Sequence, residues 1–324
     1  MTILAGALSY TACAQSGSLA GPPASTEAPA SSGAQPATPD PSRVLTSVGI
    51  RGVVAPGTLT EFLRSGFNGT EGVISLPDGS VLFCELNANK IIHIDLNGNF
   101  STYLEDANRT TGLGFDHKGR LISAQSRDPR IGVLMPRRET LADSFGGQPL
   151  VRPNDVVVDR KNGIYFSDPL PMPHTQFRDP PPGRKPLILY ITPAGRVIEA
   201  TAEVAQPNGV QLSPDEKTFY ATDGDHLVAF DVQPDGSLRN LRRFADVAGG
   251  DGLAVDRDGR LYVATEPGVQ IVSKEGQVLG LIPTPVRMQS IGFAGVDHKT
   301  LYAVGRGAVY RIRLLSRGVP GRAK

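Results

Sequence analysis

Short apolar segments recur along the chain at a nearly constant spacing. Six of them have the composition of a strand centre, and most follow a turn rich in Asp, Gly or Lys: residues 81–83, 121–123, 164–166, 219–221, 261–263 and 301–303. Their centres are 40, 43, 55, 42 and 40 residues apart. A period near 40 residues, with four short strands in each unit, is typical of a β-propeller. An all-β sandwich is the alternative, but it does not predict a sixfold period.

Each unit divides into four strands separated by short turns. In the fifth unit the strands are GLAVD, RLYVAT, GVQIVS and GQVLGLI, and the turns carry Gly and Asp, which tolerate positive φ. The sixth unit has three evident strands, so we expect residues 58–63 to close the ring without leaving an exposed sheet edge. The pattern predicts an all-β, six-bladed propeller over residues 46–316, with four antiparallel strands per blade. Residues 317–324 would form a C-terminal tail.

The one long interval, 55 residues, marks an insertion in the third unit. The extra residues are PLPMPHTQFRDPPPGRKP at positions 169–186, between the second and third strands of that unit. A Pro-rich insertion of this size is usually a surface excursion or a lid. It contains His174, Arg178 and Arg184. We expect the two arginines to be exposed and solvated, with contact to an anionic substrate as the alternative.

The first 45 residues differ from the rest of the chain. Residues 1–14 begin with a short apolar stretch, which we interpret as the remnant of a secretory signal or as a lipoprotein signal. Ala12-Cys13-Ala14 fits a cleavage site, whereas Thr11-Ala12-Cys13 resembles the end of a lipobox with Cys13 as the lipid anchor. Residues 15–45 are rich in Pro, Ala and Ser and predict a disordered tether.

This leader predicts a bacterial protein that is exported, either periplasmic or lipid-anchored outside the cytoplasm. The apolar stretch is too short to span a bilayer, so we expect no transmembrane segment in the mature protein. A frayed terminus of a cytoplasmic protein is the alternative.

Composition narrows the function further. The chain has 33 Lys and Arg against 32 Asp and Glu, a net charge of +1, which argues against binding to nucleic acid. With 37 Gly and 27 Pro it contains many turns, and its two cysteines cannot form a disulfide framework or a thiolate zinc site. No G-x-S-x-G elbow, H-E-x-x-H motif or P-loop is present. We expect a monomer.

A polar residue opens one apolar run in every unit, 11 or 12 residues before the strand centre. These residues are Glu71, Thr111, Asn154, Asn208, Asp251 and Ser290. The runs that follow are continuously apolar, as expected of innermost strands buried on both faces. Because equivalent positions on innermost strands converge at one mouth of the propeller, we expect Glu71, Asn154, Asn208 and Asp251 to meet there.

Two carboxylates and two amides in one narrow space favour a metal ion. Without a cation the carboxylates would repel each other and lose hydration. The donors are all oxygens, which favours one Ca²⁺ ion, with Mg²⁺, Mn²⁺ or Zn²⁺ as alternatives. Taken singly, Asn208-Gly209 and Asp251-Gly252 also fit ordinary turns. Second strands return to the same mouth, so Asp168 and Asp223 either support the ligands there or are simple turn residues.

The residues at these positions resemble a known family. Arg152-Pro153-Asn154-Asp155 followed by GIYFSDP, Pro207-Asn208-Gly209 with LSPDEKTFYATD, the run DGLAVD from Asp251, and Glu71-Gly72 are similar to motifs of the senescence-marker-protein/gluconolactonase/luciferin-regenerating-enzyme family. The resemblance covers about residues 71–311. It departs from the family pattern at Glu71-Gly72-Val73, where Glu-Gly-Pro is usual, and at Thr111 and Ser290, where Asn is common.

The resemblance implies a six-bladed propeller with one catalytic divalent metal on Glu71, Asn154, Asn208 and Asp251. It also implies lactone hydrolysis, with Asp251 as general base and Arg152 as a substrate contact. Thr111 and Ser290 would then line the altered substrate rim, which leaves gluconolactone itself open.

We therefore expect a metal-dependent hydrolase of small lactones or esters. Two alternatives remain: a phosphotriesterase-like hydrolase, and a non-catalytic exported propeller that binds a peptide or a sugar.

Overall fold

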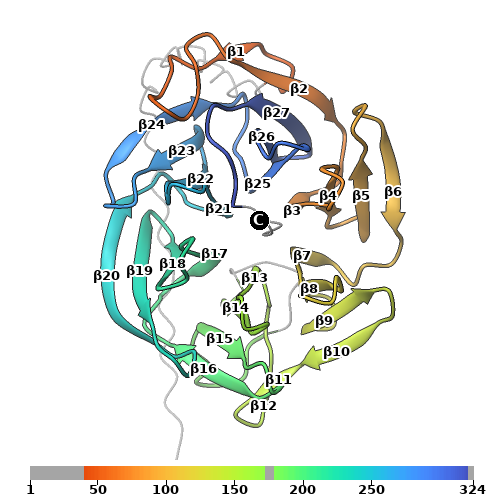
Figure 1. Cartoon of the computed structure of the whole chain (residues 1–324). Helices are drawn as coiled ribbons and strands as arrows, with labels where there is room; N and C mark the ends of the chain where they lie inside the picture. The colour runs from red at the N-terminus through yellow and green to blue at the C-terminus, as the bar shows by residue number, and fades with distance from the viewer. Residues whose placement is uncertain (1–39, 172–178, 320–324) are drawn as a thin grey trace, which may run out of the picture. The chain divides into compact units, whose positions relative to one another are not determined.

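The computed structural model describes residues 40–171 and 179–319, and all the elements in this part of the chain are β-strands. Apart from one two-stranded hairpin, they form six antiparallel sheets of four or five strands set around a central axis, as Figure 1 shows. This confirms the predicted six-bladed propeller. The expected leader at residues 1–14, with Cys13, and the tether as far as residue 39 lie outside the described residues and stay predictions. No helix in the described ranges has the length and apolar character needed to cross a membrane.

The first three blades follow one another along the chain, each with its innermost strand first. Blade 1 consists of β3 (Thr70–Ser75), β4 (Val81–Glu85), β5 (Lys90–Ile94) and β6 (Phe100–Leu104). Blade 2 consists of β7 (Thr110–Phe115), β8 (Leu121–Gln125), β9 (Arg130–Met135) and β10 (Glu139–Ala142). A small hairpin, β11 (Ser144–Phe145) and β12 (Gln148–Pro149), precedes blade 3. Blade 3 consists of β13 (Val156–Val158), β14 (Ile164–Asp168), β15 (Leu187–Ile191) and β16 (Val197–Thr201).

The next two blades repeat the same order. Blade 4 consists of β17 (Pro207–Leu212), β18 (Thr218–Asp223), β19 (His226–Val232) and β20 (Leu238–Asp246). Blade 5 consists of β21 (Leu253–Val255), β22 (Leu261–Thr265), β23 (Gly268–Val272) and β24 (Val278–Pro283). The insertion lies between β14 and β15, as predicted, but His174 and Arg178 fall in residues 172–178, outside the described residues.

Blade 6 joins the two ends of the propeller. Its inner strands are β25 (Ser290–Ala294), β26 (Thr300–Gly305) and β27 (Ala308–Arg313), and β27 pairs with β2 (Leu59–Ser65). This confirms the predicted closure by an N-terminal strand. A further short strand, β1 (Leu45–Thr46), covers the outer edge of β2. Beyond β27 the chain still contacts the propeller, because Gly318 forms a bridge with Asp256.

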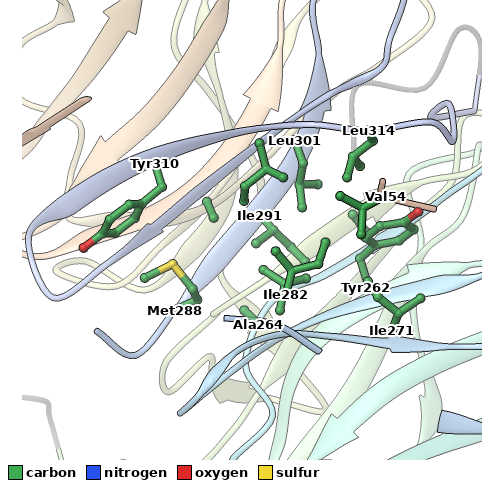
Figure 2. Close-up of a cluster of buried hydrophobic side chains, with 14 of the residues drawn as sticks. Val54, Tyr262, Ala264, Ile271, Ile282, Met288, Ile291, Leu301, Tyr310 and Leu314 are labelled. Atoms are coloured by element: carbon green, nitrogen blue, oxygen red, sulfur yellow. The ribbon is translucent and has the colours of Figure 1, made fainter. Parts of the chain in front are cut away.

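Apolar side chains fill the space between neighbouring blades. In the cluster of Figure 2, Tyr262 and Ile271 of blade 5 lie with Ile291 and Leu301 of blade 6, and Val54 packs on the same cluster. These side chains have at most 1% of their surface exposed. Since burying one such side chain contributes about 1.5–3 kcal/mol, these contacts hold the blades in the ring. A rigid ring fixes the distances between the innermost strands.

The innermost strands approach each other closely near one end of the axis. A Cβ atom at Gly209 would lie 2.3 Å from the backbone oxygen of Asp251 in the next blade. At Gly72, where φ is +56°, a Cβ atom would lie 2.6 Å from the backbone oxygen of Thr111. Only glycine fits at these two positions without displacing a neighbouring strand. Neighbouring innermost strands are therefore in close contact where the polar residues gather.

Candidate functional site

Backbone hydrogen bonds define the residue that each blade contributes to the end of the axis. The N–H groups of Asn154 and Asp251 donate to the second strand of their blades at 3.0 Å and 2.9 Å. In blade 6 the equivalent bond, 2.8 Å long, belongs to Gln289, one residue before Ser290. The sequence register is therefore one residue off in this blade. We call the set of equivalent residues the axial ring: Glu71, Thr111, Asn154, Asn208, Asp251 and Gln289.

Contacts within the axial ring connect blades that are far apart in sequence. The side-chain amide of Gln289 donates to Oε1 of Glu71 over 2.9 Å. The side chain of Asn208 hydrogen-bonds to the carboxylate of Asp251. Glu71 and Asp251 lie close enough for the charge of Asp251 to raise the pKa of Glu71.

Burial shapes the chemistry of the two carboxyl groups. Asp251 is 8% exposed, and desolvation raises its pKa from 3.8 to about 6, against the opposing effect of Arg287 and Arg152. Glu71 keeps part of its side chain exposed at the mouth, yet protein surrounds most of it. Desolvation, and next the charge of Asp251, raise the pKa of Glu71 well above its ordinary value. Both carboxylates would gain stability from a nearby positive charge.

The donor set fits a hard divalent cation. Glu71 and Asp251 offer carboxylate oxygens, and Asn154 and Asn208 offer amide oxygens, the ligand types that Ca²⁺ prefers. In residues 40–171 and 179–319, no three His, Cys, Asp or Glu side chains gather as a metal site. A cation at this end of the axis would therefore depend on the two amides as well as on the two carboxylates.

Asp155 is an acidic residue of the site that the polar register did not single out. It stands one position after Asn154, where four other blades have Gly72, Gly112, Gly209 and Gly252. Its Oδ2 atom accepts a hydrogen bond of 2.9 Å from the N–H of Val210 in blade 4. Its charge raises the pKa of both Glu71 and Asp251, so it faces the same space. An Asp at a position that Gly occupies in four other blades is the signal that could have identified it.

Ser290 has the equivalent position in blade 6 and the equivalent contact. Its Oγ atom accepts a hydrogen bond of 3.0 Å from the N–H of Val73 in blade 1. The hydroxyl of Thr111 donates to the backbone oxygen of Pro153 over 3.2 Å. The structure thus places Thr111 and Ser290 at the joints between blades. The substrate contacts expected of them stay predictions.

Two further hydroxyl groups, both on second strands, hold the backbone of the axial ring. The hydroxyl of Ser167 donates to the backbone oxygen of Asn208 over 2.7 Å, and that of Thr222 donates to the backbone oxygen of Asp251 over 2.9 Å. Each bond reaches from a second strand to the axial residue of the next blade. The backbone of two proposed ligands is thereby held by the neighbouring blade.

Asp168 and Asp223 hold the loops that lead to the axial ring. Oδ1 of Asp168 accepts a bond of 2.7 Å from the N–H of Arg152, two residues before Asn154. Oδ1 of Asp223 accepts a bond of the same length from the N–H of Gln206, two residues before Asn208. Each carboxylate thus fixes the approach of the chain to an axial amide.

The expectation for Arg184 was wrong. Its side chain is 4% exposed and forms an ion pair with Asp168, which is fully buried. The insertion therefore returns to blade 3 and buries a cation against the carboxylate that holds Arg152. The loop path that creates this pair depends on tertiary structure and leaves no local signal in the sequence.

A cavity of about 740 Å³ lies at the opposite end of the innermost strands. Asp116 and Asp159 line it, but their oxygens already accept hydrogen bonds within their own turns, from Lys118 N–H and Lys161 N–H among others. These two carboxylates are thus engaged in turn structure. We place the site at the axial ring, where the carboxyl groups have raised pKa values and no such local bonds.

Fold and site together define a class: a six-bladed propeller with acidic and amide side chains around one end of its axis. Within this class, residues 69–305 match the model of the SMP-30/Gluconolactonase/LRE-like region, and the chain belongs to that family. The resemblance inferred from the motifs is thereby confirmed.

Relatives with lactonase names share most of the chain. The gluconolactonase of Zymomonas mobilis is 24% identical over 289 residues, which cover 79% of this chain and 81% of that protein. The structure of a gluconolactonase from Xanthomonas campestris is 25% identical with a TM-score of 0.74, covering 86% of this chain and 98% of its own. A calcium-binding regucalcin from Agrobacterium tumefaciens, 17% identical with a TM-score of 0.66 over 81% of this chain and 96% of its own, shares the fold.

Proposed function

We propose that this protein is a divalent-metal-dependent lactone hydrolase, with Ca²⁺ as the favoured ion. One observation carries the proposal: the buried carboxyl groups of Glu71 and Asp251, from blades 1 and 5, share one space with axial amides. Two buried carboxylates are costly unless a cation neutralises them. The similarity to gluconolactonases supports the choice of a lactone as substrate.

The residues would divide the chemistry as follows. Glu71, Asn154, Asn208 and Asp251 would hold the ion, which when bound polarises a carbonyl group and acidifies water. In the reaction, water adds to the lactone carbonyl, the ring C–O bond breaks, and the freed oxygen takes a proton to give a hydroxy acid. Asp251, whose side chain is buried beside the proposed ion, would accept the proton of the water.

Arg152 is the residue suited to bind the substrate oxygen. Its charge lowers the pKa of both Glu71 and Asp251, so its guanidinium lies near both carboxylates. A fixed guanidinium there can donate hydrogen bonds to the oxygen on which negative charge develops. The bond from Arg152 N–H to Asp168 keeps its backbone in place.

The experiment measures bound metal and hydrolysis in the same protein. The purified chain is treated with chelator, reloaded with Ca²⁺, Mg²⁺, Mn²⁺ or Zn²⁺, and assayed on lactones, aryl esters and a phosphotriester. We expect lactone hydrolysis that chelator abolishes and one ion restores. Asp251→Asn and Glu71→Gln should each lower kcat/KM at least about 100-fold, since each removes a charged ligand.

Asp297→Asn is the matched control, because Asp297 lies at the far end of blade 6 in an ion pair with Arg313. It should retain wild-type activity. Hydrolysis that is unaffected by chelator and by both site variants would overturn the proposal. Faster turnover of the phosphotriester would favour a phosphotriesterase instead, and no turnover with any ion would favour a binding propeller.

A further inference from the structure

Three arginines occupy one repeated position beside the axial ring. Arg109, Arg152 and Arg287 each stand two residues before the axial residue of their blade, namely blades 2, 3 and 6. In the other three blades the position holds Gly69, Gln206 and Gly249. Equivalent positions converge at the same mouth, so the three residues belong to one rim. We call them the arginine rim.

Arg287 lies between the acidic centre and solvent. Its Nη2 atom is 3.6 Å from Oδ2 of Asp251 and its Nη1 atom is 3.3 Å from Oε2 of Glu266. A Cβ atom at Gly249 would lie 3.6 Å from Nη1, so the guanidinium lies against the backbone of blade 5. The side chain is 28% exposed and Glu266 is 64% exposed. An exposed ion pair of this kind is weak and can exchange for a bound anion.

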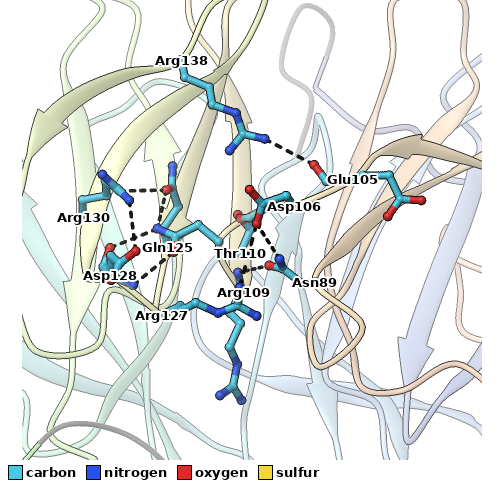
Figure 3. Close-up of polar contacts among 12 residues, drawn as sticks. Asn89, Glu105, Asp106, Arg109, Thr110, Gln125, Arg127, Asp128, Arg130 and Arg138 are labelled. Carbon is cyan, nitrogen blue, oxygen red and sulfur yellow. Dashed lines mark hydrogen bonds and ion pairs between the residues drawn. The ribbon is translucent and has the colours of Figure 1, made fainter.

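Arg109 is held at the rim in an unusual backbone conformation. Its φ is +51°, a left-handed value that is costly for a residue with a side chain. Its N–H donates to Oδ1 of Asn89 over 2.7 Å, as Figure 3 shows, and its backbone oxygen accepts a bond of 2.8 Å from the hydroxyl of Ser126. Its Nη2 atom donates to Oδ1 of Asn87 over 3.0 Å. These hydrogen bonds hold the backbone and the side chain of Arg109 in place.

The acidic centre and the arginine rim have equal and opposite formal charges: Glu71, Asp155 and Asp251 carry three negative charges, and the three arginines carry three positive ones. A divalent cation at the axial ring, as required by the proposed function, would take over the neutralisation of the carboxylates there. Arg287, whose ion pairs with Asp251 and Glu266 are 3.6 Å and 3.3 Å long, can then bind an anionic group of the substrate, because planar guanidinium groups bind carboxylates well.

We propose that the arginine rim binds an anionic group of the substrate, so that the protein prefers acidic lactones, in particular lactones of sugar dicarboxylic acids. This inference rests on the proposed lactone hydrolysis and specifies its substrate class. Arg109 and Arg287 are the residues that determine this specificity, and Arg152 lies near Glu71 and Asp251.

A matched pair of substrates tests the preference. An aldarolactone carries a carboxylate where the corresponding aldonolactone has a hydroxymethyl group. We expect kcat/KM for the acidic lactone to exceed that for the neutral one at least about tenfold at low salt, as one charged hydrogen bond allows. High salt should reduce this ratio, because screening weakens exposed charges.

Variants separate binding of the anion from a structural role. Arg287→Ala and Arg109→Ala should each lower the ratio about tenfold, and Arg287→Lys should restore part of it. Arg313→Ala removes the same charge from the far end of blade 6 and should leave the ratio at the wild-type value. A purely structural role of the arginines would lower kcat/KM for both substrates equally, and this outcome would overturn the inference.

A binding measurement does not depend on turnover. Calorimetric titration should show that glucarate, a dicarboxylate, binds the Ca²⁺-loaded protein at least about tenfold more tightly than gluconate, and that the difference is lost in Arg287→Ala. Lactone hydrolysis without any preference for the acidic substrate or ligand refutes the inference and leaves the proposed function intact. Tighter binding of glucarate without lactone hydrolysis refutes the proposed function and supports the anion site.

Discussion

The side-chain amide of Gln289 donates a hydrogen bond of 2.9 Å to the carboxylate of Glu71, across 218 positions of sequence. This bond joins the last blade to the first directly at the site. The N–H of Arg306 donates a hydrogen bond of 2.9 Å to Oε1 of Gln289, and this second bond fixes the orientation of the side-chain amide. Glu71 is thus positioned by the same closure that completes the ring.

Gln289→Ala should weaken both the ring closure and the site. The variant leaves the carboxylate of Glu71 without its donor, so we expect the free energy of unfolding to fall by about 1–3 kcal/mol and the metal affinity to fall with it. Urea unfolding and calorimetric metal titration measure the two effects. Gln270→Ala, which loses an exposed bond to the backbone of Asp246, should change neither by a comparable amount. Unchanged metal affinity in Gln289→Ala would contradict the expected role.

Neutralising an axial carboxyl group should stabilise the metal-free protein at neutral pH. Burial raises the pKa of Asp251 from 3.8 to about 6, so the native state holds this proton more tightly than the unfolded chain. The resulting stability is complete below pH 3.8 and is lost as pH rises through about 6. In chelator at pH 7.5, Asp251→Asn and Glu71→Gln should therefore raise the free energy of unfolding by about 1–3 kcal/mol.

At pH 4.5, where the wild-type carboxyl groups hold protons, the free energy of unfolding of Asp251→Asn and Glu71→Gln should rise much less. Asp297→Asn should instead lower the free energy of unfolding at pH 7.5, because the hydrogen bond from Arg313 lowers the pKa of Asp297 to about 2 and so stabilises its carboxylate. Equal gains at both pH values in the two site variants would show that desolvation of charge is not the cause.

Breaking the buried pair of Asp168 and Arg184 should be costly. Asp168→Asn leaves the guanidinium of Arg184, which is 4% exposed, with no compensating charge, and we expect a loss of about 3–5 kcal/mol in urea unfolding. The double variant Asp168→Asn, Arg184→Met should recover most of that stability. It should not fully recover activity, because an amide oxygen accepts the N–H of Arg152 more weakly than the carboxylate does. Additive losses in the double variant would contradict a direct ion pair.

Gly209→Ala should damage the site more than the fold. The new Cβ atom would lie 2.3 Å from the backbone oxygen of Asp251, so the axial residue of blade 5 must move. We expect at least about a 10-fold loss of kcat/KM and a loss of about 1–3 kcal/mol in stability. Gly114→Ala is the matched control on another innermost strand, where the nearest atom would be 3.4 Å away. Wild-type activity in Gly209→Ala would show that the position of Asp251 tolerates displacement.

The repeat was predictable because it is local. Four short strands per unit require a turn every few residues, and Gly and Asp mark these turns at a spacing of about 40 residues. The same periodicity placed Glu71, Asn154, Asn208 and Asp251 at equivalent positions. The remaining strand, β2, could be assigned to the closure because an open sheet edge is unfavourable.

The errors and omissions have a common physical origin. Gln289 and Ser290 are adjacent polar residues, and only the backbone bond from Gln289 to the second strand shows which of them belongs to the ring. Asp155 follows Asn154, which already occupies the polar position of blade 3, so the polar pattern did not single out Asp155. The burial of Arg184 depends on the path of the insertion, which no periodicity describes.

The sequence by itself determined the fold class, the number of blades, the closing strand and four residues of the candidate site, because these follow from hydrophobic periodicity and turn chemistry. Only the tertiary structure decided which side chains touch: Gln289 with Glu71, Asp168 with Arg184, Arg287 with Asp251. These pairs form because closing the ring brings distant residues within a few ångströms. Desolvation of the carboxyl groups, and hence their raised pKa values, exists only after that closure.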